Sequence, residues 1–300
     1  MTAQSLTEPE LVMPAKGALL PGGLHVRRAI PQARRRMVGP FIFLDEMGPA
    51  ELAAPKSADV LAHPHIGLST LTYLFAGEGL HKDSLGSVQR ILPGEVNWMA
   101  AGGGIVHAEF MRGGGAGNLH GLQFWVAHPD GAEERDPSFT HYDADATRSG
   151  GEGGVHWTLI SGSLWGERTD IQVTSPLFLV EARLEAGAVL ELPAEYDERA
   201  VYVLSGEAVA GTTGLKSGDV ALLPRRGTVP VVAREDARVI LFGGDPLGSP
   251  RHIRWNFVSS SKDRLAQAAE DWRQRRFPRI PGEDRYIPLP GDGNAPVFYP

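Results

Sequence analysis

Short apolar runs broken by glycine- and proline-containing turns recur along most of this 300-residue chain. Three examples lie close together: "STLTYLFAGEG" (69–79), "SVQRILPGEVNWMAAGGG" (87–104) and "HGLQFWVAHP" (120–129). The 37 glycines and 23 prolines are spread along the chain without a collagen-like period. Turns at intervals of roughly eight to twelve residues predict short strands that form closed or sandwiched β-barrels.

The C-terminal half of the chain repeats the pattern of the N-terminal half. "TYLFAGEG" (72–79) matches "VYVLSGEA" (201–208), and "LPGEVNWM" (92–99) matches "LKSGDVALL" (215–223). A repeat of this length indicates two copies of one β unit. We therefore expect an all-β protein with one barrel in residues 1–140 and a second in 141–250. The polar stretch 129–155 is expected to be a linker or long loop between them.

The last fifty residues, 251–300, have a different character. Leu265, Ala268, Ala269 and Trp272 recur at helical spacing within 259–277, after a run of serines that suits a helix N-cap. The sequence therefore predicts a helical segment, followed by a tail that is too rich in proline for regular structure and that wraps over a surface.

Charge and cysteine content exclude several classes of protein. The 29 basic and 36 acidic residues give a net charge of -7, so direct binding of nucleic acid is not expected. The absence of cysteine rules out disulfides, iron–sulfur clusters and thiolate zinc sites. No apolar stretch is long enough to span a bilayer and no secretory signal is visible, which favours a cytoplasmic location. Any metal must be held by histidine and carboxylate.

Two histidine-containing segments predict a metal site. His63-Pro64-His65 precedes the strand at 69–75, and His107-Ala108-Glu109 follows the glycine loop 102–104. Residues i and i+2 of a strand face the same side, so His63, His65, His107 and Glu109 can converge on one divalent ion. Iron, manganese, nickel, cobalt, copper and zinc all accept such ligands.

The repeat provides an internal control for this prediction. Alignment of the two halves places His63 on Leu192 and His107 on Val231, and there is no histidine between 157 and 251. The metal is therefore expected only in the first barrel. His81 and Asp83 are interpreted as a polar turn rather than support for the ligands, and His120 and Gln123 as residues that could approach the site. Large side chains that could wall a flat ligand, although barrel core is the simpler role for each, are Phe41, Phe43, Trp98, Met99 and Phe124.

The same segments resemble the pirin family of the cupin superfamily. The resemblance is carried by "VGPFIFLDEM" (38–47), "HPHIGLSTLTYLFAGEGLHKDSLG" (63–86), "LPGEVNWMAAGGGIVHAE" (92–109) and "LHGLQFWV" (119–126), and it extends over about residues 25–280. It implies a bicupin fold. It also implies that the N-terminal barrel binds one metal, usually taken as iron, through His63, His65, His107 and Glu109, and that the C-terminal barrel is metal-free. Two departures, Ala108 and His128, are expected to alter the pocket.

The resemblance also implies a function. Pirins have been linked to quercetin 2,3-dioxygenase activity, and eukaryotic members to transcriptional co-regulation. We therefore expect a metal-dependent dioxygenase, most simply with Fe(II), that opens flavonol-like aromatic substrates with O2 while Glu109 acts as general base. The alternative is a non-catalytic metal- or redox-sensing regulator that binds a protein partner. A sugar isomerase, with Lys82 or Arg90 contacting an anion, is a weaker third option.

Overall fold

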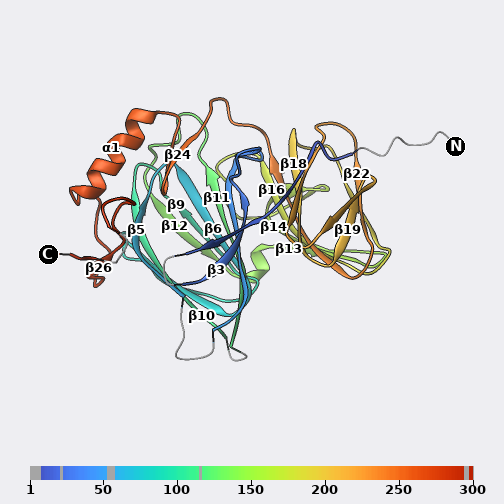
Figure 1. The fold of residues 1–300 in the computed structure, drawn as a ribbon, viewed down its shortest axis with the longest axis horizontal. Coiled ribbons are helices and arrows are strands. Elements are labelled where there is room, and N and C mark those ends of the chain that lie inside the picture. The colour runs from blue at the N-terminus through green and yellow to red at the C-terminus, as the bar shows by residue number, and fades with distance from the viewer. Residues whose placement is uncertain (1–7, 21–22, 53–57, 115–116, 294–296, 300) are drawn as a thin grey trace. The chain divides into compact units, whose positions relative to one another are not determined.

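The computed structural model describes residues 8–20, 23–52, 58–114, 117–293 and 297–299. Strands make up most of this part of the chain, as expected, and they form two compact units (Figure 1). The N-terminal barrel comprises residues 17–26, 44–144 and 247–300, and the C-terminal barrel comprises 1–16, 27–43 and 145–246. Residues 1–16 and 27–43, which the sequence assigns to the first domain, thus belong to the C-terminal barrel, and 247–300 belong to the N-terminal barrel. No helix in the described residues is long and apolar enough to cross a membrane.

The N-terminal barrel is built from two antiparallel sheets. One has the strand order β12-β9-β6-β11-β4-β3-β2, and the other has the order β27-β26-β5-β10-β7-β8. The strands β3 and β4 run from one unit into the other. The bounds are β2 (Lys16–Leu19), β3 (His25–Ile30), β4 (Phe41–Glu51), β5 (Ala58–His65), β6 (Leu68–Ala76), β7 (Glu78–Asp83), β8 (Val88–Ile91), β9 (Val96–Ala100), β10 (Ile105–Arg112), β11 (Asn118–Ala127), β12 (Ser138–Tyr142), β26 (Arg285–Tyr286) and β27 (Val297–Phe298).

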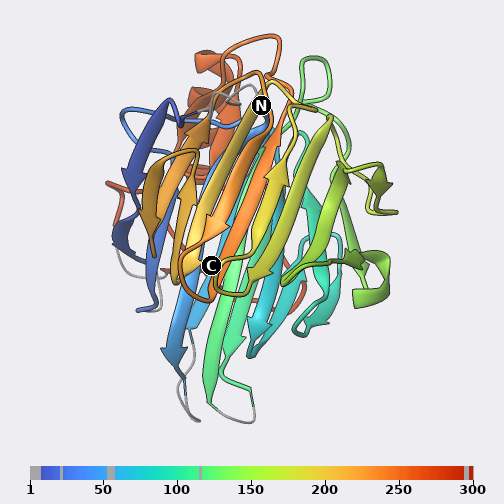
Figure 2. The ribbon, with the colours of Figure 1, turned by 90° about the vertical axis from the view of Figure 1, so that its right-hand side faces the viewer.

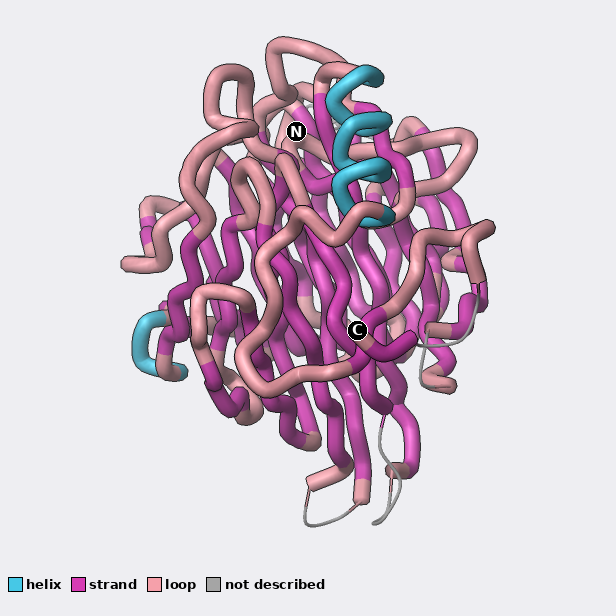
Figure 3. Tube along the Cα trace, turned by 90° about the vertical axis from the view of Figure 1, so that its left-hand side faces the viewer, coloured by secondary structure: helices cyan, strands magenta, loops and turns pink. Residues whose placement is uncertain are grey.

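The C-terminal segment packs on the outside of this barrel (Figure 3). It contains the hairpin β24 (His252–Arg254) and β25 (Phe257–Ser259), followed by helix α1 (Lys262–Arg273). Ser261 caps the helix by accepting a hydrogen bond from the Arg264 amide. The apolar face of α1 has the predicted spacing and is buried against Ala62, Val106 and Ala108 of β5 and β10. Beyond the helix, the tail lies on the barrel surface as expected. The prediction that it has no regular structure is wrong, because it forms the short strand β26, in which Tyr286 pairs with Ala62 of β5.

The C-terminal barrel has an eight-stranded and a four-stranded sheet that enclose an aliphatic core. The strands of the larger sheet lie side by side in Figure 2. The bounds are β1 (Leu11–Pro14), β13 (Arg148–Gly150), β14 (Val155–Leu164), β15 (Glu167–Arg168), β16 (Leu177–Leu184), β17 (Val189–Leu192), β18 (Glu198–Ser205), β19 (Glu207–Ala210), β20 (Thr213–Lys216), β21 (Asp219–Leu223), β22 (Val229–Ala233) and β23 (Ala237–Gly244). The order β17 to β23 matches β5 to β11, which confirms the internal repeat.

The stretch 129–155 is more structured than the sequence predicted. It contains β12, a 3-10 turn (Ala144–Ala146) and β13. Strand β12 pairs with β9 in the register Phe139↔Met99 and ends its sheet. Its polar composition misled the prediction because an edge strand keeps half of its side chains in solvent.

Candidate metal centre

Three histidines on the adjacent strands β5 and β10 converge inside the N-terminal barrel. His107 pairs with His63 across the ladder and Ile105 pairs with His65, so the three imidazoles project from one face of the sheet. Their ring centroids are 4.3 Å apart for His63 and His107, 4.9 Å for His65 and His107, and 5.1 Å for His63 and His65. One ring nitrogen from each lies within 4.8 Å of the other two, which is suitable for a shared ion.

Hydrogen bonds fix the tautomers of two of these rings. The Nδ1 of His63 lies 2.8 Å from the Leu61 carbonyl oxygen, and the Nδ1 of His65 lies 3.1 Å from the carbonyl oxygen of Asn256. A carbonyl oxygen can only accept, so each Nδ1 carries the proton and donates it. The Nε2 lone pairs of His63 and His65 are therefore free to bind a cation.

His107 provides the test of whether a metal fits. It is only 1 % exposed, yet neither ring nitrogen has a hydrogen-bond partner among the described residues. Buried polar atoms without a hydrogen-bond partner are rare in proteins, and one explanation is that the atom binds a metal ion. Burial lowers the pKa of all three imidazoles, that of His63 to about 4, so they are neutral at physiological pH. Neutral imidazole is the form that binds metals, so the donor set fits a divalent cation.

Glu109 faces the same interior but stands apart from the three imidazoles. It is outside the group of ligand atoms that lie within 4.8 Å of one another, so its role as the fourth ligand remains a prediction. Strand β5 has one extra residue opposite this point, since His107 pairs with His63 but Glu109 pairs with Val60. The Thr72 hydroxyl has one hydrogen and lies 2.8 Å from Gln123 Oε1, which leaves a weak contact at 3.4 Å to Glu109 Oε1. Burial raises the pKa of Glu109 to about 7, and the Thr72 contact opposes this only in part.

His81 and Asp83 form a buried pair beside the histidines, which corrects their interpretation as a polar turn. Both belong to β7, where Asp83 pairs with His107 and His81 pairs with Glu109. The Nε2 of His81 lies 3.0 Å from Asp83 Oδ2, and its ring stacks on Phe139. Burial alone would raise the pKa of Asp83, but hydrogen bonds from His81 and Ser87 outweigh it and the pKa is lowered. The Asp83 carboxylate is therefore ionised and holds the His81 ring beside His107.

Comparison with known proteins agrees with this architecture. Residues 23–126 match the Pirin domain and residues 179–278 match the Pirin C-terminal cupin domain. A pirin-like protein of Caulobacter vibrioides is 49 % identical over 276 residues, which are 90 % of this chain and 95 % of that protein. The chain belongs to the pirin family. The expected bicupin fold is thereby confirmed.

Three further proteins are similar to this pirin in sequence or structure. A Pseudomonas aeruginosa protein named as a candidate quercetin 2,3-dioxygenase is 38 % identical and is matched over 89 % of this chain and 85 % of its own length. The crystal structure of quercetin 2,3-dioxygenase from Acinetobacter baumannii superposes with a TM-score of 0.84 at 32 % identity, covering 96 % of this chain and 95 % of that one. A bacterial pirin from Escherichia coli, solved in complex with nickel(II), has a TM-score of 0.61 at 18 % identity, covers 79 % of this chain and all of that one, and supports the fold alone.

The C-terminal barrel of this pirin has an aliphatic core where the N-terminal barrel has its histidines. Strand β17 pairs with β22 in the registers Leu190↔Val231 and Leu192↔Val229. If Val231 corresponds to His107, then its ladder partner Leu190 corresponds to His63. The ungapped sequence alignment had placed His63 on Leu192, which is two residues further along the strand. All four side chains are buried in the core.

The residues flanking the histidines differ from the sequence candidates. Trp125 lies edge-on to His65, with ring centroids 5.1 Å apart. It was not selected from the sequence, although it is two residues from Gln123 on β11 and therefore shares a strand face with it. Gln123 reaches the site through Thr72, whereas His120 bonds Glu46 instead. Of the proposed wall residues, Phe41 packs on Phe242 and Phe43 lies under Arg28, both in the C-terminal barrel.

The two departures from the family pattern do not alter the pocket as expected. Ala108 is on the opposite face of β10, buried under the C-terminal segment. The His128 ring donates from Nδ1 to the Ala132 carbonyl oxygen and accepts at Nε2 from the Ser69 hydroxyl, at 3.2 and 2.9 Å. Both residues are therefore structural.

Proposed function

We propose that this pirin is a mononuclear metal-dependent oxygenase of the quercetin 2,3-dioxygenase type. The observation that carries the proposal is the convergence of three buried, neutral imidazoles, each with one ring nitrogen close to the others. The relatives named for quercetin dioxygenase activity support the same assignment. Iron(II) is the proposed ion, although nickel in the Escherichia coli pirin makes the ion itself part of the test.

The proposed roles follow from the geometry. His63, His65 and His107 would hold the ion, which supplies Lewis acidity toward a substrate hydroxyl and, if it is iron, redox chemistry toward O2. Glu109 Oε would accept the proton of the flavonol hydroxyl, and its weak contact with Thr72 leaves the carboxylate available for this. Trp125 and the buried ladder around His107 would keep bulk water away from the reacting atoms.

One observation favours the non-catalytic alternative, a metal- or redox-sensing regulator. The cavity beside Glu109 is too narrow for a water molecule. It is lined by Thr72, Gly79, Leu80, His81, Ile91, Asn97, Glu109 and Met111. Small-molecule sites are usually several hundred cubic ångströms in volume. A flavonol placed in this cavity, beside Glu109, would need these side chains to move, whereas a sensing role needs only the ion.

Two measurements distinguish the candidates. Elemental analysis of protein purified without added metal tests for the ion, and aerobic incubation of the iron-loaded protein with quercetin tests for turnover through loss of the flavonol absorbance. Turnover that is abolished in Glu109→Gln and in His63→Ala, but kept in the control Glu78→Gln, whose carboxylate is half-buried and pairs with Arg90, supports the oxygenase. Retained iron without turnover, together with hydrogen exchange of surface loops that differs between Fe(II) and Fe(III), supports the regulator. Failure of His63→Ala to lose metal refutes the site.

A further inference from the structure

The hairpin β24–β25 presents one backbone carbonyl to the histidine cluster. His252 pairs with Ser259 and Arg254 with Phe257, which leaves Trp255 and Asn256 as a two-residue turn. Trp255 has φ +54°, a left-handed conformation that is unfavourable for a residue other than glycine. At the next residue, the Asn256 carbonyl oxygen accepts the hydrogen bond from His65 Nδ1. A strained turn therefore supplies the partner that sets the His65 tautomer.

His63 and His65 differ in where this partner comes from. His63 donates to Leu61, two residues away in its own strand, so its orientation is local. His65 donates to a carbonyl 191 residues away in the sequence. Its orientation therefore depends on the C-terminal segment staying seated on the barrel.

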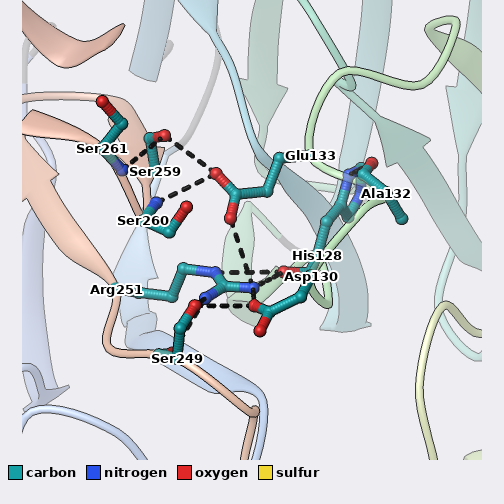
Figure 4. Close-up of polar contacts among 9 residues, drawn as sticks. All are labelled: His128, Asp130, Ala132, Glu133, Ser249, Arg251, Ser259, Ser260 and Ser261. Atoms are coloured by element: carbon teal, nitrogen blue, oxygen red, sulfur yellow. Dashed lines mark hydrogen bonds and ion pairs between the residues drawn. The ribbon is translucent and has the colours of Figure 1, made fainter. Parts of the chain in front are cut away.

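A buried polar network holds the start of this hairpin (Figure 4). The Arg251 side chain, directly before β24, is fully buried. It donates from Nε and Nη2 to the His128 carbonyl oxygen, at 3.1 and 2.7 Å, and from Nη2 to Asp130 Oδ1 at 2.7 Å. These acceptors lie in the loop after β11, so the guanidinium fastens the hairpin to the barrel.

Glu133 holds the other end of the hairpin. Its Oε2 accepts hydrogen bonds from the Ser259 hydroxyl at 2.8 Å and from the Ser260 amide at 2.9 Å, while Oε1 lies 3.3 Å from Arg251 Nη2 (Figure 4). One carboxylate therefore ties the end of β25 to the arginine before β24. Both ends of the strained turn are fixed.

We propose that Arg251 and Glu133 are positioning residues of the metal centre, which act through the hairpin and the Asn256 carbonyl to fix the tautomer and orientation of His65. This inference rests on the proposed three-histidine site. Outer hydrogen bonds of this kind orient metal-bound imidazoles, and their loss costs about 10–100-fold in metal affinity. The C-terminal segment would thus complete the site of a barrel formed by residues far earlier in the chain.

The test reads the imidazole directly, without metal, by long-range 1H–15N correlation spectra that distinguish a protonated Nδ1 from a protonated Nε2. In the metal-free parent, His63 and His65 should both be protonated at Nδ1. Glu133→Gln should shift His65 toward the other tautomer and leave His63 unchanged, so His63 is an internal control. Ser259→Ala removes the hydrogen bond that the hydroxyl donates to Glu133 and the one it accepts from the Ser261 amide, and leaves the Ser260 bond to Glu133. It should do the same more weakly, and it serves if Glu133→Gln fails to fold. The control Arg273→Gln breaks an ion pair with Asp292 elsewhere in the C-terminal segment and should change neither ring.

Cobalt(II) titration of the same proteins supplies the second readout. Glu133→Gln should bind cobalt about 10–100-fold more weakly than the parent, and Arg273→Gln within about twofold. An unchanged His65 tautomer with unchanged affinity overturns the proposal, and so do equal shifts of His63 and His65, which would indicate general loosening. If the parent binds no cobalt while His65 alone still responds, the proposed function fails and the positioning role stands.

Discussion

Replacing Glu109 by glutamine should stabilise the metal-free protein, and only at high pH. Burial raises the pKa of Glu109 from 4.5 to about 7. Between these values the folded chain keeps a proton that the unfolded chain has released, so stability falls as pH rises. The cost corresponds to about 3 kcal/mol at pH 8 and to less than about 1 kcal/mol at pH 5. Glutamine removes the ionisation and keeps an acceptor for Thr72.

Urea unfolding of the chelator-treated protein at the two pH values measures this difference. The matched control is Glu78→Gln, because Glu78 lies on β7 in a more exposed ion pair with Arg90 and should change stability by less than about 1 kcal/mol at either pH. The sign should reverse in the metal-saturated protein, where a nearby cation stabilises the ionised carboxylate. There, Glu109→Gln should lower the unfolding midpoint.

The reasoning is refuted if Glu109→Gln destabilises the metal-free protein at pH 8, or if its effect is the same at pH 5 and pH 8. Either result would mean that the carboxylate has a favourable partner in the metal-free protein. The Thr72 hydroxyl would then have to donate to Glu109 rather than to Gln123.

Three further perturbations have clear expected outcomes. Burial lowers the pKa of His63 to about 4, so the folded metal-free protein resists protonation of this ring and loses stability on acidification. His63→Gln should therefore reduce the loss in unfolding free energy between pH 6.5 and pH 4 by about 3 kcal/mol relative to the parent. Urea unfolding at a series of acidic pH values checks this. Gly67→Ala should destabilise the protein by more than about 2 kcal/mol in thermal unfolding, because a Cβ at φ +70° would lie 2.0 Å from the Val258 carbonyl oxygen. Arg199→Met should cost about 2–4 kcal/mol in urea unfolding, because the buried guanidinium satisfies three backbone carbonyls; a loss below about 1 kcal/mol would contradict that role.

Strand alternation explains why part of the site was predictable from sequence. His63 and His65 share a face because they are two residues apart in one strand, and the same holds for His107 and Glu109. That rule is local and needs no knowledge of the fold. The rule does not predict how far Glu109 lies from the histidines. The extra residue of β5 between Val60 and His63 shifts the pairing of the two strands at this point. Nothing in the sequence marks that bulge.

Other features of the site leave no local signal in the sequence. Asn256 acts through its backbone carbonyl, so any residue type could stand there and only the fold reveals it. His81 and Asp83 were misread because a polar strand that faces a polar interior has the composition of a turn. The polar stretch that contains Glu133 resembled a linker, since charged residues are rarely buried unless paired, and its partner Arg251 lies more than one hundred residues away.

The two barrels give one more prediction, because equivalent strand pairs carry polar side chains in one barrel and aliphatic side chains in the other. The pair β5 and β10 carries histidines, whereas β17 and β22 carry leucine and valine. In the C-terminal barrel, Leu190 and Val231 stabilise the ladder by burial alone and need no ligand. In the N-terminal barrel, His107 gains nothing comparable from burial, because its two desolvated ring nitrogens have no hydrogen-bond partner among the described residues. A bound ion, as proposed, would supply that partner and would stabilise the folded state by mass action. Chelation should therefore accelerate amide hydrogen exchange in β5 and β10 and leave β17 and β22 unchanged; equal acceleration in both barrels would show that the ion is not held by this ladder.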